Sequence, residues 1–191
     1  MRLSAPSPAP PVKLTDTNGK PVILADGEHA TLLCFFRDPA CPFCNLRIYE
    51  LTQRHAQYQA LGLKIVALFS GTGEEVKRFV LRHPRPFQVV ADPNPQTYEA
   101  YGIEHSFWRK LKAVVTRIPA LLRGLRIVGL AGLKTNNLLP ADFLLDENGH
   151  IVECWYGRDA GDRIPFDRIE LFLARRLARR KDLEQTQPRP A

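Results

Sequence analysis

Apolar residues in this chain gather in short runs, and between the runs they recur every three or four positions. Five runs have the length and composition of strands, at residues 32–36, 63–69, 87–91, 141–145 and 150–156. Helical spacing is found over residues 44–58, 73–83 and 165–180. Because helical segments separate the first strands, the pattern predicts βαβ units with right-handed crossovers, and hence an α/β fold.

The two ends of the chain differ from this core. Residues 4–11 read SAPSPAPP, a composition typical of an extended or disordered arm, so residues 1–11 are expected to be flexible. Asn18-Gly19 stands between two apolar triplets, which predicts an opening β-hairpin. Residues 181–191 are polar and are expected to fray. One domain over residues 12–180 remains.

The first predicted strand is followed by a short loop and then by Cys41-Pro42-Phe43-Cys44, which opens a helical pattern. Cys44 begins the apolar stripe of this helix, so Cys41 lies at the helix start and Cys44 one turn further in. The unpaired N–H groups and the positive end of the helix dipole favour a thiolate at that start. Pro42 suits the first turn because no N–H is needed there.

This placement gives the two cysteines different expected roles. We expect Cys41 to be reachable from solvent, to have a lowered pKa and to act as the nucleophile. Cys44 lies within disulfide reach and is expected to be the less exposed, resolving thiol. A structural zinc site needs about four ligands, whereas Cys34 and Cys154 stand alone in strand-like runs typical of buried thiols. The spacing favours redox chemistry, with metal binding or purely structural thiols as the alternatives.

Residues 105–137 contain seven Lys and Arg side chains and no Asp or Glu, so this segment alone accounts for the net charge of +7. Within this segment apolar residues recur at intervals of three and four positions, and basic residues stand next to them. This spacing predicts one amphipathic helix, or two helices broken before Pro119. The apolar stripe comprises Trp108, Leu111, Val115, Ile118, Leu122 and Leu125. The simplest interpretation is a cap that packs this stripe on the core. Binding to an anionic membrane surface or to a protein partner is the alternative, and nucleic acid is disfavoured because aromatic residues are sparse.

Composition narrows the setting. A chain of 191 residues with 45% hydrophobic and 25% charged residues is ordinary for one globular domain. We see no signal-peptide pattern and no apolar run long enough to span a membrane. Four cysteines, two of them in one motif, favour a reducing, cytoplasmic location. No phosphate-cradling Gly-rich loop is evident, and no cofactor is expected.

The strand, the loop, the CPFC sequence and the amphipathic helix together resemble the thioredoxin fold. The wider frame is similar to the alkyl hydroperoxide reductase / thiol-specific antioxidant superfamily in its peroxiredoxin-like branch, on residues 12–22 (VKLTDTNGKPV) and 139–146 (LPADFLLD). This resemblance implies a central mixed β-sheet flanked by helices, with the N-terminal hairpin ahead of it and the basic insertion before a late strand. It also implies that Pro140 is a cis-proline that faces the cysteines and shapes a substrate groove.

The resemblance fails at positions that activate peroxide in typical peroxiredoxins. Their proline and threonine before the reactive cysteine correspond to Cys34 and Asp38, and their late arginine corresponds to Pro140. An Asp38 carboxylate near a thiolate would oppose its formation. The CPFC sequence and Pro140 are instead thioredoxin-like, so thiol–disulfide exchange on a peroxiredoxin-like scaffold fits better than a standard peroxidase.

The same topology carries residues 157–162 to the edge of the sheet where the cysteines lie. There Arg158 either stabilises a thiolate or a developing anion, or pairs on the surface with Asp159 or Asp162. The sequence leaves these two interpretations open.

The function that we expect is a thiol-dependent oxidoreductase. Cys41 attacks a disulfide or a peroxide oxygen, and Cys44 resolves the adduct to a Cys41–Cys44 disulfide. Pro42 and Phe43 would support the motif, and an external thiol reductant of the thioredoxin or glutathione type would restore the dithiol. A homodimer is compatible with this scheme. The alternatives are a redox sensor, or a membrane-surface or partner-binding module that keeps the scaffold without turnover.

Overall fold

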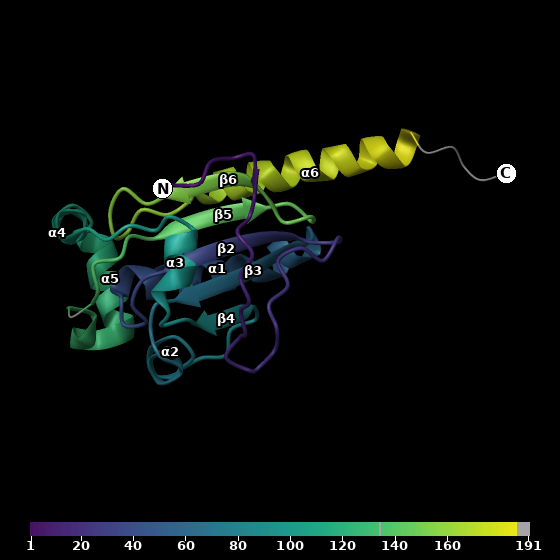
Figure 1. Cartoon of the computed structure of the whole chain (residues 1–191). Coiled ribbons are helices and arrows are strands. Elements are labelled where there is room, and N and C mark those ends of the chain that lie inside the picture. Colours follow the sequence, from purple (N-terminus) through teal and green to yellow (C-terminus); the bar gives the residue numbers. More distant parts are fainter. Residues whose placement is uncertain (134, 187–191) are drawn as a thin grey trace.

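The computed structural model describes residues 1–133 and 135–186, in which six strands form one mixed sheet in the order β1-β6-β5-β2-β3-β4 (Figure 1). The strands are β1 (Ser7–Pro8), β2 (Ala30–Phe36), β3 (Leu63–Phe69), β4 (Gln88–Ala91), β5 (Ala141–Leu145) and β6 (His150–Tyr156). β2, β3 and β4 run parallel, whereas β5 is antiparallel to both β2 and β6. The central mixed sheet predicted from the sequence is confirmed.

Helices cover both faces of this sheet (Figure 1). They are α1 (Pro42–Ala60), α2 (Gly73–Phe79), α3 (Pro95–Ala100), α4 (Phe107–Thr116), α5 (Ile118–Val128), the short 3-10 helix η1 (Gly129–Leu133) and α6 (Phe166–Thr186). Alternate residues of the fully buried strand β2 point to opposite sides. Leu32, Cys34 and Phe36 join the core formed with α1 and α6, while Leu33 and Phe35 join the core beneath α3.

The N-terminal region differs from its prediction. The expected hairpin is reduced to a turn with one isolated bridge between Thr15 and Pro21, in which Gly19 adopts a positive φ of 79°. Pro21 has no N–H to donate, which limits a regular ladder there. The N-terminal arm is attached to the sheet and not flexible as expected. β1 pairs with the outer edge of β6, and the Leu3 N–H donates to the Tyr156 hydroxyl at 2.8 Å.

The C-terminal helix is longer than predicted. The expected helix ends at residue 180, whereas α6 continues to Thr186. The expected fraying of the tail therefore does not describe residues 181–186, and residues 187–191 lie outside the described part of the chain.

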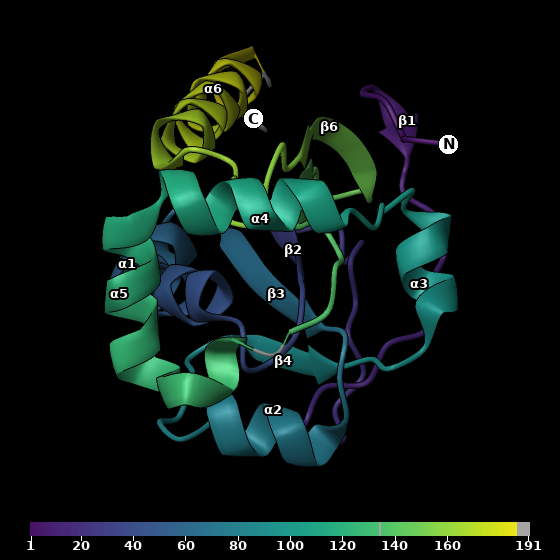
Figure 2. The ribbon, with the colours of Figure 1, turned by 90° about the vertical axis from the view of Figure 1, so that its left-hand side faces the viewer.

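The basic segment forms two helices, which was one of the two predicted arrangements. The break between them lies at Arg117, just before Pro119. Figure 2 shows α4 and α5 together at one end of the molecule, and α5 packs along α1. We call α4, α5 and η1 the cap. Its position places it directly over the start of α1, where the CPFC sequence lies.

Candidate active site

Cys41 is the N-cap residue of α1, at the end of the short loop that follows β2. Its Sγ accepts a hydrogen bond from the Cys44 N–H at 3.4 Å. The loop is held by Asp38, whose carbonyl oxygen accepts from the Cys41 N–H at 2.9 Å and whose Oδ1 accepts from the Ala40 N–H at 2.8 Å. The Asp38 carboxylate therefore binds backbone, and its effect on this site is structural.

A buried arginine contacts the Cys41 sulfur. Arg37 is 1% exposed and donates from Nη1 to Cys41 Sγ at 3.3 Å. Its other N–H groups hold the chain that follows the cap: Nε donates to the Leu138 carbonyl at 2.5 Å, and Nη2 donates to the Asn136 carbonyl. One guanidinium thus connects the Cys41 thiol to residues 136–138, the segment between the cap and β5.

These contacts separate the two thiols electrostatically. Burial raises the pKa of Cys41, but the hydrogen bond from the Cys44 thiol, the Arg37 charge and the N–H groups of Cys44 and Phe43 outweigh it and lower the pKa to about 6. Burial raises the pKa of Cys44, and the negative charge at Cys41 raises it further. The two thiols therefore differ in acidity, with the thiolate favoured at Cys41 and the protonated form favoured at Cys44.

A buried ion pair lies under the two thiols. Arg163 approaches Asp142 Oδ1 at 3.0 Å, and its guanidinium stacks 4.0 Å from the centre of the Phe36 ring. Asp142 Oδ2 accepts from the Ile164 N–H at 2.9 Å, so the carboxylate also fixes the loop before α6. Asp142 pairs with Cys34 across β2 and β5, and burial raises the pKa of that thiol well above its usual range. Cys34 is a core residue, as predicted.

The cap closes the site from outside, and here the expected accessibility of Cys41 is wrong. Cys41 is 0% exposed and Cys44 is 3% exposed. Two glycines of the cap lie on Pro42: an added Cβ at Gly124 would be 2.4 Å from the Pro42 carbonyl oxygen, and one at Gly132 would be 2.6 Å from Pro42 Cγ. Contact at this distance excludes solvent from the helix start.

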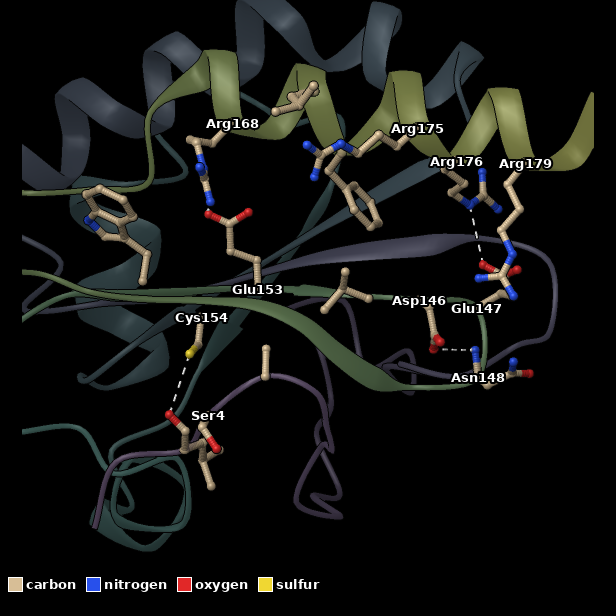
Figure 3. A pocket seen from close by; sticks show the side chains of 16 residues that line it. Ser4, Asp146, Glu147, Asn148, Glu153, Cys154, Arg168, Arg175, Arg176 and Arg179 are labelled. Carbon is tan, nitrogen blue, oxygen red and sulfur yellow. Dashed lines mark hydrogen bonds and ion pairs between the residues drawn. The ribbon is translucent and has the colours of Figure 1, made fainter.

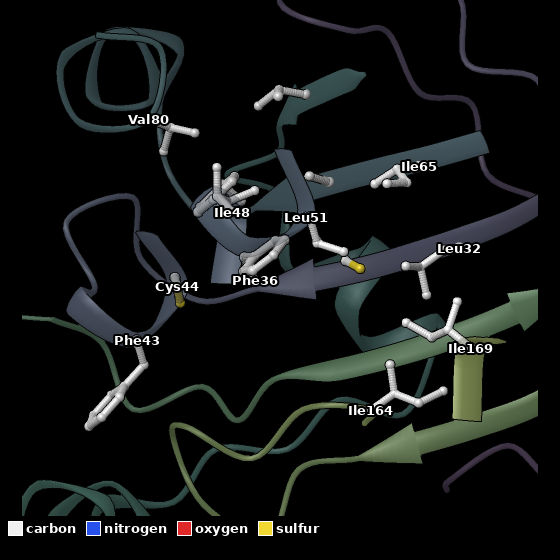
Figure 4. Close-up of a cluster of buried hydrophobic side chains, with 14 of the residues drawn as sticks. Leu32, Phe36, Phe43, Cys44, Ile48, Leu51, Ile65, Val80, Ile164 and Ile169 are labelled. Atoms are coloured by element: carbon white, nitrogen blue, oxygen red, sulfur yellow. The ribbon is translucent and has the colours of Figure 1, made fainter. Parts of the chain in front are cut away.

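The core supports the site from below. Figure 4 shows Cys44 at one end of the buried cluster that contains Phe36, Ile48 and Leu51, and Phe43, a member of the same cluster, lies beside it at the margin. Phe43 lies against Gly161, where an added Cβ would be 3.1 Å from the ring. The loop of residues 157–162 therefore borders the motif, as predicted.

Two residues predicted for the site have other roles. Arg158 is exposed, its Nε lies 3.8 Å from Asp162 Oδ2, and it contacts neither thiol, so the surface-pairing alternative describes it. Pro140 is not a cis-proline, since the cis bond found among the described residues is Ala5–Pro6. Pro140 packs on Gly157 and accepts the Gly157 N–H at 2.9 Å, a strand-start position that suits the ordinary trans form.

Comparison with known proteins bears on this geometry. A model of the AhpC/TSA family matches residues 6–154, most of the chain. The chain belongs to the AhpC/TSA family. It is 26% identical to peroxiredoxin Bcp of Escherichia coli strain K12, over 63% of this chain and 79% of that protein, and 28% identical to the thiol-disulfide oxidoreductase ResA of Bacillus subtilis, over 53% of this chain and 57% of that protein. A mutant PrxQ of Xylella fastidiosa superposes with a TM-score of 0.64 at 13% identity, covering 94% of this chain and 98% of that one.

These similarities confirm the predicted class of this AhpC/TSA protein, a thiol-dependent oxidoreductase on a thioredoxin-like scaffold. They divide between a peroxiredoxin and a thiol-disulfide oxidoreductase. The same division is seen in the residues, where a CPFC dithiol stands in a peroxiredoxin-like frame.

A pocket of this AhpC/TSA protein lies elsewhere (Figure 3). It has a volume of about 820 Å³ between α6, β6 and the N-terminal arm. Cys154 lines it and donates to the Leu3 carbonyl at 3.5 Å, so this thiol is half-buried rather than fully buried. None of its lining residues belongs to the CPFC sequence or the cap. This pocket is therefore separate from the two thiols of the CPFC sequence.

Two further findings concern ligands and membranes. Within residues 1–133 and 135–186, no group of three or more His, Cys, Asp or Glu side chains is arranged to hold a metal ion. Among the helices described, none has the length and apolarity required to cross a membrane.

Sequence reasoning missed the residue that best explains the thiolate. Arg37 follows a buried strand directly and precedes Cys41 by four positions. An arginine at the end of a fully apolar strand is a weak signal, because its side chain normally turns to solvent. Arg163 and Asp142 gave no signal, since their pairing depends on contacts across the fold.

Proposed function

We propose that this protein is a dithiol oxidoreductase in which the Cys41 thiolate is the nucleophile and Cys44 is the resolving thiol. The observation that carries the proposal is the 3.3 Å contact between Arg37 and Cys41 Sγ at the N-cap of α1. A thiolate in that position is stabilised by the guanidinium charge and by helix N–H groups. The neighbouring thiol at Cys44 keeps its proton and so remains available for the second step.

With a disulfide as substrate, Cys41 Sγ attacks one sulfur and forms a mixed disulfide, while the other sulfur leaves as a thiolate and takes up a proton. Cys44 loses its proton and attacks Cys41 Sγ, which releases the second substrate sulfur and forms the Cys41–Cys44 bond. With a peroxide, the first step gives an alcohol or water and a Cys41 sulfenic acid, and the second releases water. Either cycle transfers two electrons from the dithiol to the substrate.

Disulfides are the substrate class that we favour. Position 38 holds an aspartate whose carboxylate accepts backbone N–H groups, so it offers no hydroxyl to a bound peroxide. An external thiol reductant of the thioredoxin or glutathione type would return the Cys41–Cys44 disulfide to the dithiol. Such reductants act in the cytoplasm, the location that the use of cysteine in this chain favours.

Turnover requires the cap to move, because both sulfurs are covered. The contacts that hold the cap against the rest of the protein are compatible with such motion. It rests on glycines at Pro42, and Arg117 ties it to the 157–162 loop through Asp159, with Nε 2.9 Å from Oδ1. The Arg117 side chain is 39% exposed and that of Asp159 is 8% exposed, so water reaches this ion pair from the arginine side and its strength is modest.

The test compares disulfide reduction and peroxide consumption by one preparation of wild type with Cys41→Ser, Cys44→Ser and Cys154→Ser. We expect Cys41→Ser to abolish both activities, and Cys44→Ser to accumulate a mixed disulfide with the substrate that intact-mass measurement detects. Cys154→Ser is the matched control and should keep full activity, because that thiol faces another pocket. Full activity in Cys41→Ser would refute the proposal.

A further inference from the structure

The cap carries its large apolar side chains on the outside. Six of the eleven large apolar residues that are exposed in the described chain lie between positions 107 and 122. They are Phe107, Trp108, Leu111, Val115, Ile118 and Leu122, with exposures from 43% to 76%. We call these six residues the outer stripe. Five of the six residues in the stripe predicted from the sequence belong to this exposed set, and the sixth, Leu125, is half-buried. The interpretation in which that stripe packs on the core is therefore wrong for these five residues.

The inner side of the cap explains this orientation. Ala113 is fully buried, and Gly124 and Gly132 approach Pro42 so closely that even a Cβ would collide. Gly124 and Gly132 make the closest contacts with Pro42 at the start of α1, and Leu121 and Val128 are the larger cap residues that turn inward beside them. The helices are amphipathic as predicted, but the six residues of the outer stripe lie on the solvent side. Six large apolar side chains exposed within sixteen residues favour an interaction site over an ordinary protein surface.

The same surface carries free positive charge. The side chains of Lys112, Arg123 and Arg126 are exposed, and their cationic groups make no hydrogen bond or ion pair within the described residues. The other described cations of the cap are used internally: Arg109 donates to the Gly157 and Arg158 carbonyls, for example, and Arg117 pairs with Asp159. No acidic residue lies between positions 105 and 137. The occupant of this face should therefore be apolar and negatively charged.

We propose that the outer face of α4 and α5 docks on an anionic lipid membrane surface. The stripe would enter the boundary between headgroups and acyl chains, and Lys112, Arg123 and Arg126 would contact lipid phosphates. Trp108, the most exposed residue of the stripe at 76%, packs edge-on against Phe107 with ring centres 5.7 Å apart. Aromatic side chains favour this interfacial depth. The reducing side of a cell membrane is also the side with the anionic leaflet.

A second copy of this chain fits the face less well. A two-fold contact places the same patch of each copy against the other. The three cations would then face cations, with no carboxylate in the segment to compensate. Docking on lipid is also independent of turnover, so its test does not depend on the proposed reaction.

Sedimentation with vesicles tests the proposal on the full-length reduced protein. We expect binding to vesicles of phosphatidylcholine mixed with phosphatidylglycerol and much weaker binding to phosphatidylcholine alone. Trp108→Glu combined with Val115→Glu should abolish binding. The matched control, Ile23→Glu with Leu171→Glu, adds the same charge at exposed apolar positions outside the cap and should bind like wild type. Replacing Lys112, Arg123 and Arg126 by Gln should weaken binding on the order of 100-fold, since each cation near an anionic surface contributes about five-fold.

Fluorescence gives a second readout. In a Trp155→Phe protein the remaining tryptophan is Trp108, and its emission should shift to shorter wavelength on anionic vesicles. Unaltered circular dichroism of every variant shows that the fold is kept. The proposal is overturned if wild type does not bind at low salt, or if the stripe variant binds like its control. It is equally overturned if, without lipid, wild type is a dimer that the stripe variant disperses, because a second copy would then be the occupant.

Discussion

Replacing Arg37 by Gln should raise the pKa of Cys41 and so test the electrostatic reasoning directly. The guanidinium lies 3.3 Å from the sulfur and is 1% exposed, so water screens it poorly. A neighbouring opposite charge at such a distance shifts a pKa by roughly 1–3 units. The pKa of Cys41, lowered to about 6 in the wild type, should therefore rise to about 7–9 in the variant.

A reaction rate at a single pH would be a poor measure of this change. At pH 7 a rise of two units reduces the thiolate fraction from roughly 0.9 to roughly 0.1. The more basic thiolate is also the better nucleophile, by roughly eight-fold for two units if the Brønsted coefficient is about 0.45. The two effects nearly cancel at pH 7. The midpoint of the pH profile is the quantity that separates them.

The assay is the rate of iodoacetamide alkylation of Cys41 across a pH series, with the modified peptide identified by mass spectrometry. Thiolate absorbance in the ultraviolet should give the same midpoint. Arg37→Lys keeps a charge but loses the forked geometry, so its midpoint should lie between those of wild type and Arg37→Gln. Arg158→Gln is the matched control, because that side chain contacts neither thiol. A midpoint for Arg37→Gln within about half a unit of the wild type, in a folded protein, would contradict the reasoning.

Three further predictions concern the cap and the folded state. Arg117→Ala removes the ion pair with Asp159 and should speed alkylation of Cys41 at fixed pH roughly five-fold, since a half-exposed pair contributes about 1 kcal/mol; an unchanged rate would show that the pair does not hold the cap. Gly124→Ala should lower the free energy of unfolding in urea by about 1–3 kcal/mol through overpacking, whereas the control Gly73→Ala, with open space around its Cα, should not. Folding lowers the pKa of Cys41 to about 6, whereas an unfolded cysteine has a pKa of about 8.5. The thiolate therefore contributes its full stabilisation to the reduced protein above about pH 8.5, and this contribution is lost as the pH falls to about 6. In urea unfolding across this pH range, Cys41→Ser should lack that loss of stability.

Much of the fold follows from the sequence because its strands and helices have different apolar periods. The uniformly apolar run at Leu32–Phe36 has to be a central strand, and the stripe beginning at Cys44 has to be a helix on its face. The N-terminal arm was mispredicted for a related reason. Its pairing with β6 depends on an available sheet edge, and no periodicity within the proline-rich arm reports that edge.

The site was only partly predictable. The C-x-x-C spacing and the helix start identify Cys41 and Cys44 because the relevant physics is local. The burial of Cys41 depends on the cap, and the role of Arg37 depends on carbonyl groups 99 and 101 positions later in the chain. Both are beyond the reach of local reasoning. Periodicity also predicts that the cap helices are amphipathic without saying which face meets the core. Gly124 and Gly132 were the missed signal, since two glycines in a helical segment often mark a close contact.

The position of Arg37 couples the redox state of the dithiol to the cap. In the reduced protein its buried guanidinium lies against Cys41 Sγ, where it favours the thiolate, and the same guanidinium holds the Asn136 and Leu138 carbonyls of the segment that follows the cap. Formation of the Cys41–Cys44 disulfide removes the negative charge and leaves the cation buried without a counter-ion, which is unfavourable in a site of low dielectric constant. Moving the cap outward would return Arg37 to water. Hydrogen exchange of residues 107–133 should therefore be faster in the oxidised protein than in the reduced one, and equal exchange in the two states would show that the thiolate does not hold the cap closed.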